Sequence, residues 1–215
     1  NIADVVVTVT GVNDAPVMVD GTGSATEDGG SVDIDLTALG SDADGEDDGT
    51  TLVYAVVTQP GEGSASIAAN GDDLTFDPGS AFQDLNAGET RDVTVQVQAT
   101  DAQTATSNIA DVVVTVTGVN DAPVITNATL DFSVAENTAA VTTITSSDPD
   151  TTDTSTYAIA GGADAALFQI DANTGALAFI APPDFETPLD NGGNNVYDVD
   201  VSVTDGTETD VEAVE

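Results

Sequence analysis

The stretch NIADVVVTVTGVNDAPV occupies residues 1–17 and returns without a single change at residues 108–124. Repetition at one fixed spacing indicates a tandem array of similar units. The two copies start 107 residues apart, which is the size of one small domain. The first copy has nothing before it in this sequence, so we interpret residues 1–14 as the last strand and linker of a preceding repeat.

Apolar and polar residues alternate along much of the chain, as in the stretches Val93–Val97, Val112–Val116 and Tyr197–Val203. This period of two places one face of a strand on a core and the other in water, which is typical of antiparallel sheets. No stretch shows a sustained helical period. The sequence therefore predicts an all-β chain made of tandem Greek-key β-sandwich domains.

The repeated GVNDAPV marks the joints between these domains. Proline fixes its own φ and keeps the preceding residue extended, so we expect short, stiff linkers. We place one complete domain at 15–121 and a second at 122–215. Only TETDVEAVE follows the VTDG of residues 203–206, so we expect the second domain to lack most of its last strand.

Residues 1–12 pose a separate question, because a lone strand with valines on both faces needs a partner. One interpretation is that the sequence is a piece of a longer array. The other is that residues 1–12 fill the open sandwich of the next molecule by strand addition. A head-to-tail contact of this kind does not close, so it generates a filament.

The charge of the chain excludes several functions. Arg91 is the only basic residue against 39 acids, and the formal net charge is −38. Nothing can neutralise phosphates, which excludes nucleic-acid binding. No apolar run approaches the roughly 20 residues of a transmembrane helix, so we expect no membrane insertion.

The composition also argues against catalysis, although two carboxylates could still serve a glycosidase; no sequence feature distinguishes such a pair among the 39 acids. The chain contains no histidine, cysteine or lysine, so the usual pairs of nucleophile and base cannot be built. We therefore expect no enzymatic activity and assign no catalytic residue.

The second domain resembles a bacterial cadherin-like repeat. The stretches that carry this resemblance are VAEN at 134–137, SDPD at 147–150, LFQIDANTGAL at 167–177, PDFE at 183–186 and VSVTDG at 201–206. The first domain is similar, more loosely, to the VCBS and cadherin-like repeats of large secreted adhesins. Its matching stretches are ATEDG at 25–29, SDADG at 41–45, LTFDPGSAFQDL at 74–85 and VQATDA at 97–102.

The resemblance implies Ca²⁺ as the bound ion, because the family places calcium ligands at several of these acids. For the central joint it implies Glu27, Asn120, Asp121, Asp148, Asp150 and Asp205. For the joint before the first domain it implies Asn13, Asp14, Asp42, Asp44 and Asp101. For the joint after the second domain it implies Glu136, Asp184 and Glu186.

The linker departs from the family pattern. The family has Asp-x-Asn-Asp-Asn, whereas residues 118–122 read Gly-Val-Asn-Asp-Ala. We therefore expect fewer ions here than a full cadherin joint carries. The acidic loop at 42–49 is not an EF-hand, since it lacks the glycine at the sixth position and the closing glutamate.

These features predict an extracellular calcium-binding repeat at a bacterial cell surface that forms a stiffened rod or filament. The expected partners are adjacent repeats or other copies of the chain, with a surface glycan or protein as a further partner. The alternative is a calcium-dependent carbohydrate-binding module. Sugar sites need exposed aromatic faces, and we interpret Tyr54 and Tyr157 as core residues instead.

Overall fold

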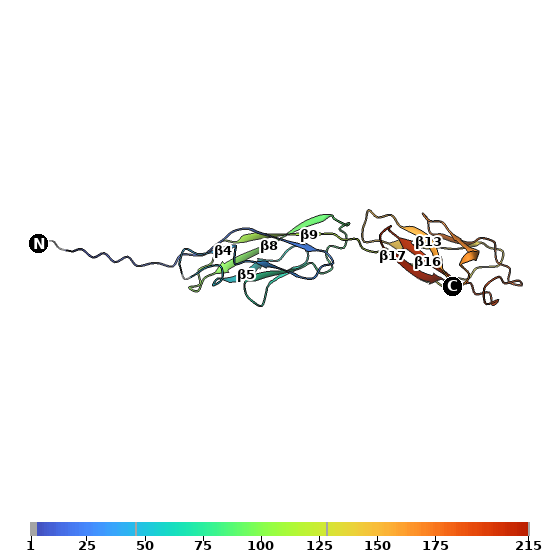
Figure 1. Cartoon of the computed structure of the whole chain (residues 1–215), viewed down its shortest axis with the longest axis horizontal. Helices are drawn as coiled ribbons and strands as arrows, with labels where there is room; N and C mark the ends of the chain where they lie inside the picture. The colour runs from blue at the N-terminus through green and yellow to red at the C-terminus, as the bar shows by residue number, and fades with distance from the viewer. Residues whose placement is uncertain (1–3, 46, 128, 215) are drawn as a thin grey trace. The chain divides into compact units, whose positions relative to one another are not determined.

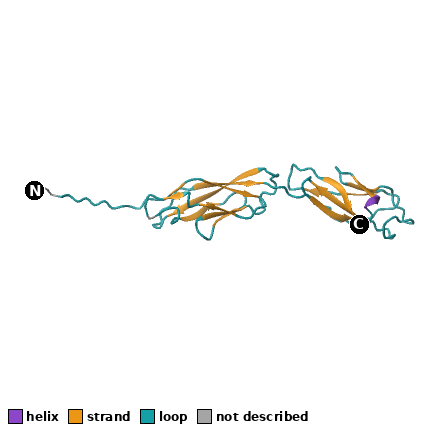
Figure 2. Ribbon diagram, in the orientation of Figure 1, coloured by secondary structure: helices purple, strands orange, loops and turns teal. Residues whose placement is uncertain are grey.

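The computed structural model describes residues 4–45, 47–127 and 129–214, and strands and loops make up nearly all of them (Figure 2). One short 3-10 helix, η1 (Ala165–Leu167), is the exception. Two compact units are present: unit 1 comprises Asn1–Phe82 and Glu89–Gly118, and unit 2 comprises Gln83–Gly88 and Val119–Glu215. Within the described ranges, no helix has the length and apolar character needed to cross a membrane. The predicted all-β class is confirmed.

The larger sheet of unit 1 contains four strands in the order β2-β9-β8-β5. Their bounds are Gly21–Thr26 (β2), Val53–Thr58 (β5), Thr90–Thr100 (β8) and Ala110–Thr117 (β9). β9 lies between two neighbours, parallel to β2 and antiparallel to β8 (Figure 1). This central place explains why every second residue of β9 is buried.

The smaller sheet of unit 1 has the order β3-β7-β6, and a separate pair joins β1 to β4. Their bounds are Val17–Met18 (β1), Val32–Asp35 (β3), Gly40–Ser41 (β4), Ser64–Ile67 (β6) and Asp73–Asp77 (β7). The four-stranded and three-stranded sheets of unit 1 pack closely face to face. A Cβ added to Gly23 of β2 would collide with the Ile34 side chain of β3. The predicted alternation in β8 is confirmed, since Val93, Val95 and Val97 are all buried in this core.

Unit 2 repeats the plan with two three-stranded sheets, β13-β16-β17 and β11-β15-β14, and the pair β10-β12. The bounds are Val124–Ile125 (β10), Ala140–Thr143 (β11), Ser146–Ser147 (β12), Thr156–Gly161 (β13), Phe168–Ile170 (β14), Ala176–Phe179 (β15), Val199–Thr204 (β16) and Thr209–Val214 (β17). Val199, Val201 and Val203 of β16 share one core with Phe168 and Phe179 of the opposite sheet. Unit 2 is therefore also a sandwich.

Three details differ from what the sequence led us to expect. The last strand of unit 2, β17, is longer than we expected from the sequence. It pairs with all six residues of β16, although apolar and polar residues hardly alternate along it. Tyr197 lies before β16 and not inside it. Residues 4–16, all of which the structure describes, form no strand, and the valines at positions 5, 7 and 9 are between 78% and 89% exposed.

Both tyrosines that we interpreted as core residues are buried. Tyr54 is 4% exposed and its hydroxyl donates to the Gly49 carbonyl over 2.6 Å, and burial raises the pKa of Tyr54 to about 12. Tyr157 is 9% exposed and its hydroxyl lies 2.8 Å from the Ser146 Oγ. Neither ring is available as a platform for a sugar.

The stretch IDANTGAL at 170–177 predicts a hairpin turn in which Gly175 has positive φ, and the turn between β14 and β15 confirms it. Gly175 has φ +69°, and the carboxylate of Asp171 accepts the backbone N–H groups of Asn173 and Thr174 at 3.0 and 2.9 Å. The Ile144 carbonyl occupies the position that a Cβ on Gly175 would need. Only glycine therefore fits this turn without displacing the backbone.

Gly175→Ala is expected to destabilise unit 2 by about 1–3 kcal/mol, because it adds both backbone strain and a collision. Thermal unfolding followed by circular dichroism measures the effect. Gly193→Ala is the matched control, since Gly193 has φ +63° with nothing within 4 Å of the added Cβ. Equal losses for the two variants would show that the collision with Ile144 is unimportant.

Candidate metal centre

Acidic side chains from three separate segments meet in unit 2, and we call this group the unit 2 acidic cluster. Its members are Asn120, Asp121, Asp148, Asp150, Asp153 and Asp205. The linker before β10 supplies the first two, the loop after β12 supplies the next three, and the turn between β16 and β17 supplies the last. Carboxylate oxygens of Asp148, Asp153 and Asp205 all lie within 4.8 Å of one another.

Hydrogen bonds attach the linker to this cluster. The Asn120 Nδ2 donates to Asp205 Oδ2 over 2.9 Å, and the Asp121 backbone N–H donates to Asp150 Oδ2 over 2.8 Å. The Asp150 N–H in turn donates to Asp148 Oδ1 over 3.0 Å. Asp148 and Asp150 therefore each accept a backbone N–H at one oxygen and have a second oxygen for another partner.

Those second oxygens are the unusual feature of the cluster. Asp150 is 1% exposed, and its Oδ1 has no hydrogen-bond partner among the residues that the structure describes. The same holds for the buried Oδ2 of Asp148 within the described ranges. A buried carboxylate oxygen without a partner costs stability unless a cation balances it.

The local charges shift two pKa values in opposite directions. Burial raises the pKa of the Asp148 carboxyl, and the negative charges of three neighbouring aspartates add to this increase. The hydrogen bond from the Asn120 side chain lowers the pKa of Asp205, helped by backbone N–H groups of the turn that follows. The ionised form of Asp148 is therefore destabilised by its surroundings, whereas the ionised form of Asp205 is stabilised by hydrogen bonds.

Unit 1 contains an equivalent group, the unit 1 acidic cluster, made of Asn13, Asp14, Asp42, Asp44, Asp47 and Asp101. The Asn13 Nδ2 donates to Asp101 Oδ2 over 2.9 Å, and the Asp14 N–H donates to Asp44 Oδ2 over 2.8 Å. The buried Asp42 Oδ2 has no hydrogen-bond partner in the described part of the chain. Each of these features has its counterpart in unit 2.

Two members of these clusters are absent from the sequence-based ligand set. Asp47 is 6% exposed, and burial raises its pKa together with the charges of Asp101 and Asp42. Asp153 holds the matching place in unit 2. The signal was present in the sequence, because DADGED at 42–47 and DPDTTD at 148–153 place aspartates at the same three positions.

The remaining predicted ligands lie elsewhere. Glu27 is a buried residue of unit 1 that directly follows β2, and its backbone N–H donates to the Thr117 carbonyl over 3.1 Å. Glu136, Asp184 and Glu186 come together in unit 2, with carboxylate oxygens within 4.8 Å, but all three are exposed. Exposure leaves that third group solvated, so it lacks the buried carboxylate oxygens of the unit 1 and unit 2 acidic clusters.

The donor atoms in the unit 1 and unit 2 acidic clusters are carboxylate and amide oxygens. Arg91, the single basic side chain, pairs with Glu62 over 3.2 Å and so is engaged elsewhere. Hard divalent cations prefer such oxygen donors, and Ca²⁺ takes six to eight of them. The residues present therefore fit a calcium ion at each cluster.

Residues 13–117 match the family model of the bacterial Ig domain. This part of the chain is therefore similar to a bacterial Ig domain. No curated protein matches the sequence of the whole chain.

Solved structures with the same fold are cadherin repeats. Repeats 1–2 of human protocadherin-24 are similar with a TM-score of 0.55 and 18% identity, over 94% of both chains. Repeats 1–4 of Drosophila N-cadherin give a TM-score of 0.55 and 16% identity over 92% of this chain, and repeats 22–24 of mouse cadherin-23 give 0.54 and 23% over 94%. The chain spans 48% and 64% of the length of these last two structures. The fold of the chain is thus cadherin-like and Ig-like.

Asp148→Asn is expected to raise the unfolding temperature of unit 2 by a few degrees in EDTA. Because the pKa of Asp148 is raised in the folded state, stability falls as the pH rises from the usual value of 3.8 through the folded value. Asparagine removes the charge and keeps an oxygen for the Asp150 N–H. Calorimetry at pH 7 measures the change.

Asp198→Asn is the control for this experiment, because Asp198 is exposed and lies outside the cluster. It should leave the transition unchanged. If Asp148→Asn instead lowers the unfolding temperature in EDTA, repulsion within the cluster is not the dominant effect.

Proposed function

We propose that this chain is a non-enzymatic, extracellular calcium-binding repeat that serves as a structural or adhesive segment of a bacterial surface fibre. The observation that carries the proposal is the set of buried carboxylate oxygens without hydrogen-bond partners among the described residues, at Asp42, Asp148 and Asp150. Two independent units show the same arrangement, which supports a ligand site over a chance grouping of acids.

The ion would be held in unit 2 by the carboxylates of Asp121, Asp148, Asp150 and Asp205, with the Asn120 amide oxygen and Asp153 completing the oxygen set. In unit 1 the ligands would be Asp14, Asp42, Asp44, Asp47 and Asp101, with Asn13. Bound Ca²⁺ supplies positive charge where the chain has only negative charge. The sequence-based ligand Glu27 remains part of the proposal.

The mechanism follows from where the ligands lie in the chain. Asn120 and Asp121 belong to the linker, and the other ligands of the unit 2 acidic cluster belong to loops of the sandwich. An ion bound by both therefore fixes the linker to the sandwich and limits its rotation. Without the ion, hydrogen bonds from Asn120 and Asp121 attach the linker to Asp205 and Asp150, while the carboxylates of the cluster repel one another. Calcium would thus convert a hinged chain into a stiffened rod.

We also propose that copies of the chain associate head to tail through residues 1–12. The exposure of the valines in this segment supports the proposal. An exposed run of valines in a soluble protein is typical of a surface that meets a partner.

Calcium is expected to raise the unfolding temperature of both units. One site adds about 2.7 kcal/mol when the ion is present at about 100 times its Kd, which corresponds to roughly 10–20 °C for a domain of this size. Calorimetry with calcium, and with EDTA, measures the shift. Titration calorimetry measures the number of ions.

Asp148→Asn and Asp42→Asn are expected to remove most of the calcium-dependent gain from unit 2 and unit 1, respectively. In calcium, Asp148→Asn should therefore lower the unfolding temperature of unit 2, whereas in EDTA it should raise it. Asp198→Asn should keep the full gain. Unfolding temperatures that are indifferent to calcium, together with an absence of binding heat, would overturn the proposal.

A further inference from the structure

Two asparagine–glycine steps occur in the chain, at residues 70–71 and 191–192. This dipeptide carries its own chemistry, because the backbone nitrogen of the glycine can attack the side-chain carbonyl carbon of the asparagine. Glycine has no Cβ to obstruct the approach, and asparagine is among the thermolabile residues of proteins. The surroundings of each step decide whether the folded chain permits the attack.

The step at 70–71 is closed by hydrogen bonds. The Asn70 Nδ2 donates to Asp73 Oδ2 over 2.6 Å, and the Asn70 Oδ1 accepts the backbone N–H of Asp72 over 3.1 Å. The Gly71 N–H, which contains the attacking nitrogen, donates to the Ala68 carbonyl over 3.0 Å. The side-chain amide and the nitrogen that would attack it are therefore both occupied.

The step at 191–192 is open. Both residues are exposed, and among the residues that the structure describes neither the Asn191 side chain nor the Gly192 N–H has a hydrogen-bond partner. The backbone N–H of Asn191 does have a partner, but that nitrogen takes no part in the attack. The Gly192 nitrogen can therefore approach the Asn191 amide without breaking a hydrogen bond to another described residue.

Two buried aspartates hold the base of the loop that carries this step. Asp164 accepts the backbone N–H of Asn191 at Oδ1 over 2.7 Å. Asp190 accepts the backbone N–H groups of Asn194 and Asn195 over 2.9 and 3.0 Å. The base of the loop is therefore fixed by carboxylates, whereas its tip lies in solvent.

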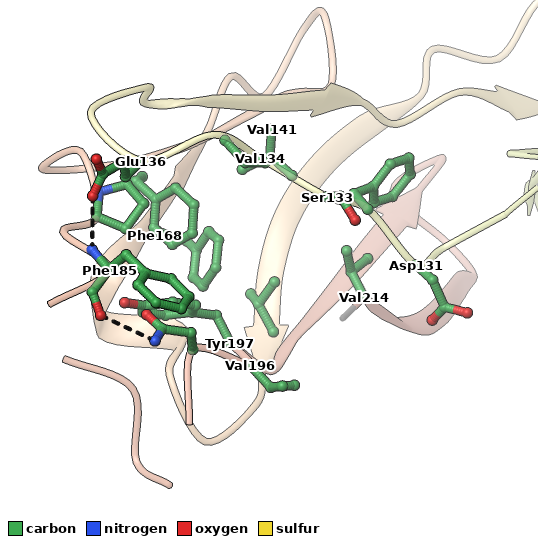
Figure 3. A pocket seen from close by; sticks show the side chains of 15 residues that line it. Asp131, Ser133, Val134, Glu136, Val141, Phe168, Phe185, Val196, Tyr197 and Val214 are labelled. Atoms are coloured by element: carbon green, nitrogen blue, oxygen red, sulfur yellow. Dashed lines mark hydrogen bonds between the residues drawn. The ribbon is translucent and has the colours of Figure 1, made fainter. Parts of the chain in front are cut away.

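The same loop contacts the exposed acidic group of unit 2. The Asn195 Nδ2 donates to the Phe185 carbonyl over 3.2 Å, and the Phe185 N–H donates to Glu136 Oε2 over 3.2 Å (Figure 3). Phe185 lies in the chain between Asp184 and Glu186, the other two members of that group. The loop and the acidic group therefore share one set of hydrogen bonds.

We infer that Asn191 is a site of spontaneous modification, at which the side-chain amide is converted to aspartate and isoaspartate. The Gly192 nitrogen loses its proton and bonds to the Asn191 Cγ, while the bond from Cγ to Nδ2 breaks and Nδ2 leaves as ammonia after accepting a proton. Solvent water then opens the resulting five-membered imide at either carbonyl carbon. Opening at the backbone carbonyl gives isoaspartate, in which the chain runs through Cβ and Cγ. This inference goes beyond the proposed function and does not depend on calcium binding.

The isoaspartate product has a structural consequence that the aspartate product lacks. Isoaspartate inserts one carbon into the backbone between residues 191 and 192, inside the turn that Asp190 closes through Asn194. The added length displaces the N–H groups that the two buried aspartates accept, so isoaspartate should lower the unfolding temperature of unit 2.

Peptide mapping of the intact chain after storage at physiological temperature tests the site. Cleavage after glutamate places the two steps in separate peptides, 63–89 and 187–208. Conversion of an amide to an acid adds one mass unit, and fragmentation assigns it to one asparagine. We expect the folded chain to convert Asn191 at least about tenfold faster than Asn70, because several hydrogen bonds must open before Asn70 can react. In denaturant the two rates should become similar, since both asparagines then precede an unrestrained glycine.

Two variants test the chemistry in the same assay. Gly192→Ala places a Cβ beside the attacking nitrogen and should remove most of the conversion at Asn191. Gly193→Ala is the matched control, because it adds the same methyl group one residue later, with nothing within 4 Å of it. This control should convert Asn191 at nearly the original rate.

Thermal unfolding of stored and fresh chains tests the consequence. Stored chain enriched in isoaspartate should unfold at a temperature a few degrees lower in unit 2. Freshly prepared Asn191→Asp has the added charge without the added backbone carbon, so it should unfold like the original chain.

Each part of the inference can fail separately. Equal conversion of Asn70 and Asn191 in the folded chain, or no gain of mass in peptide 187–208, would overturn the assigned site. An unchanged unfolding temperature in stored chain, or an equal loss in fresh Asn191→Asp, would overturn the role of the inserted carbon.

Discussion

Carboxylate oxygens that are buried without a balancing charge are the constraint on which the organisation of this chain depends. Asp42, Asp148 and Asp150 each place such an oxygen beside other acids, at the start of a sandwich. Burial of this kind opposes folding unless hydrogen bonds or a cation compensate. The backbone N–H groups of Asp14 and Asp121 supply part of that compensation, and the proposed calcium ion supplies the rest.

The hydrophobic cores have to support these clusters with small side chains. Valines at alternate positions of β8, β9 and β16 are buried in the two cores beside a few larger side chains such as Phe76 and Phe82, and aromatic residues are only 4% of the chain. A sandwich of this composition gains its stability from a complete set of strands, because each valine contributes only about 1.5–3 kcal/mol when fully buried.

The repeated stretch connects these two features. In unit 1, residues 111–117 form β9 and residues 120–121 lead into the unit 2 acidic cluster. The copy at residues 4–14 leads into the unit 1 acidic cluster in the same way, through Asn13 and Asp14. One short sequence thus combines a core-filling strand with a set of cation ligands. Under our proposals, the same segment serves assembly and calcium binding together.

The sequence alone was enough for features that depend on local rules. Alternating valines predicted the strands of β8 and β9, and the turn at Gly175 followed from its neighbours. The aspartates at 148 and 150 were selected by the resemblance to cadherin-like repeats, and they remain proposed ligands. Tertiary structure decided the features that depend on which segments become neighbours. It brought Asp47 and Asp153 into the clusters and left Tyr197 outside β16. The physical reason is that burial and strand pairing are set by contacts between residues distant in the chain, whereas period and turn chemistry are set within a few residues.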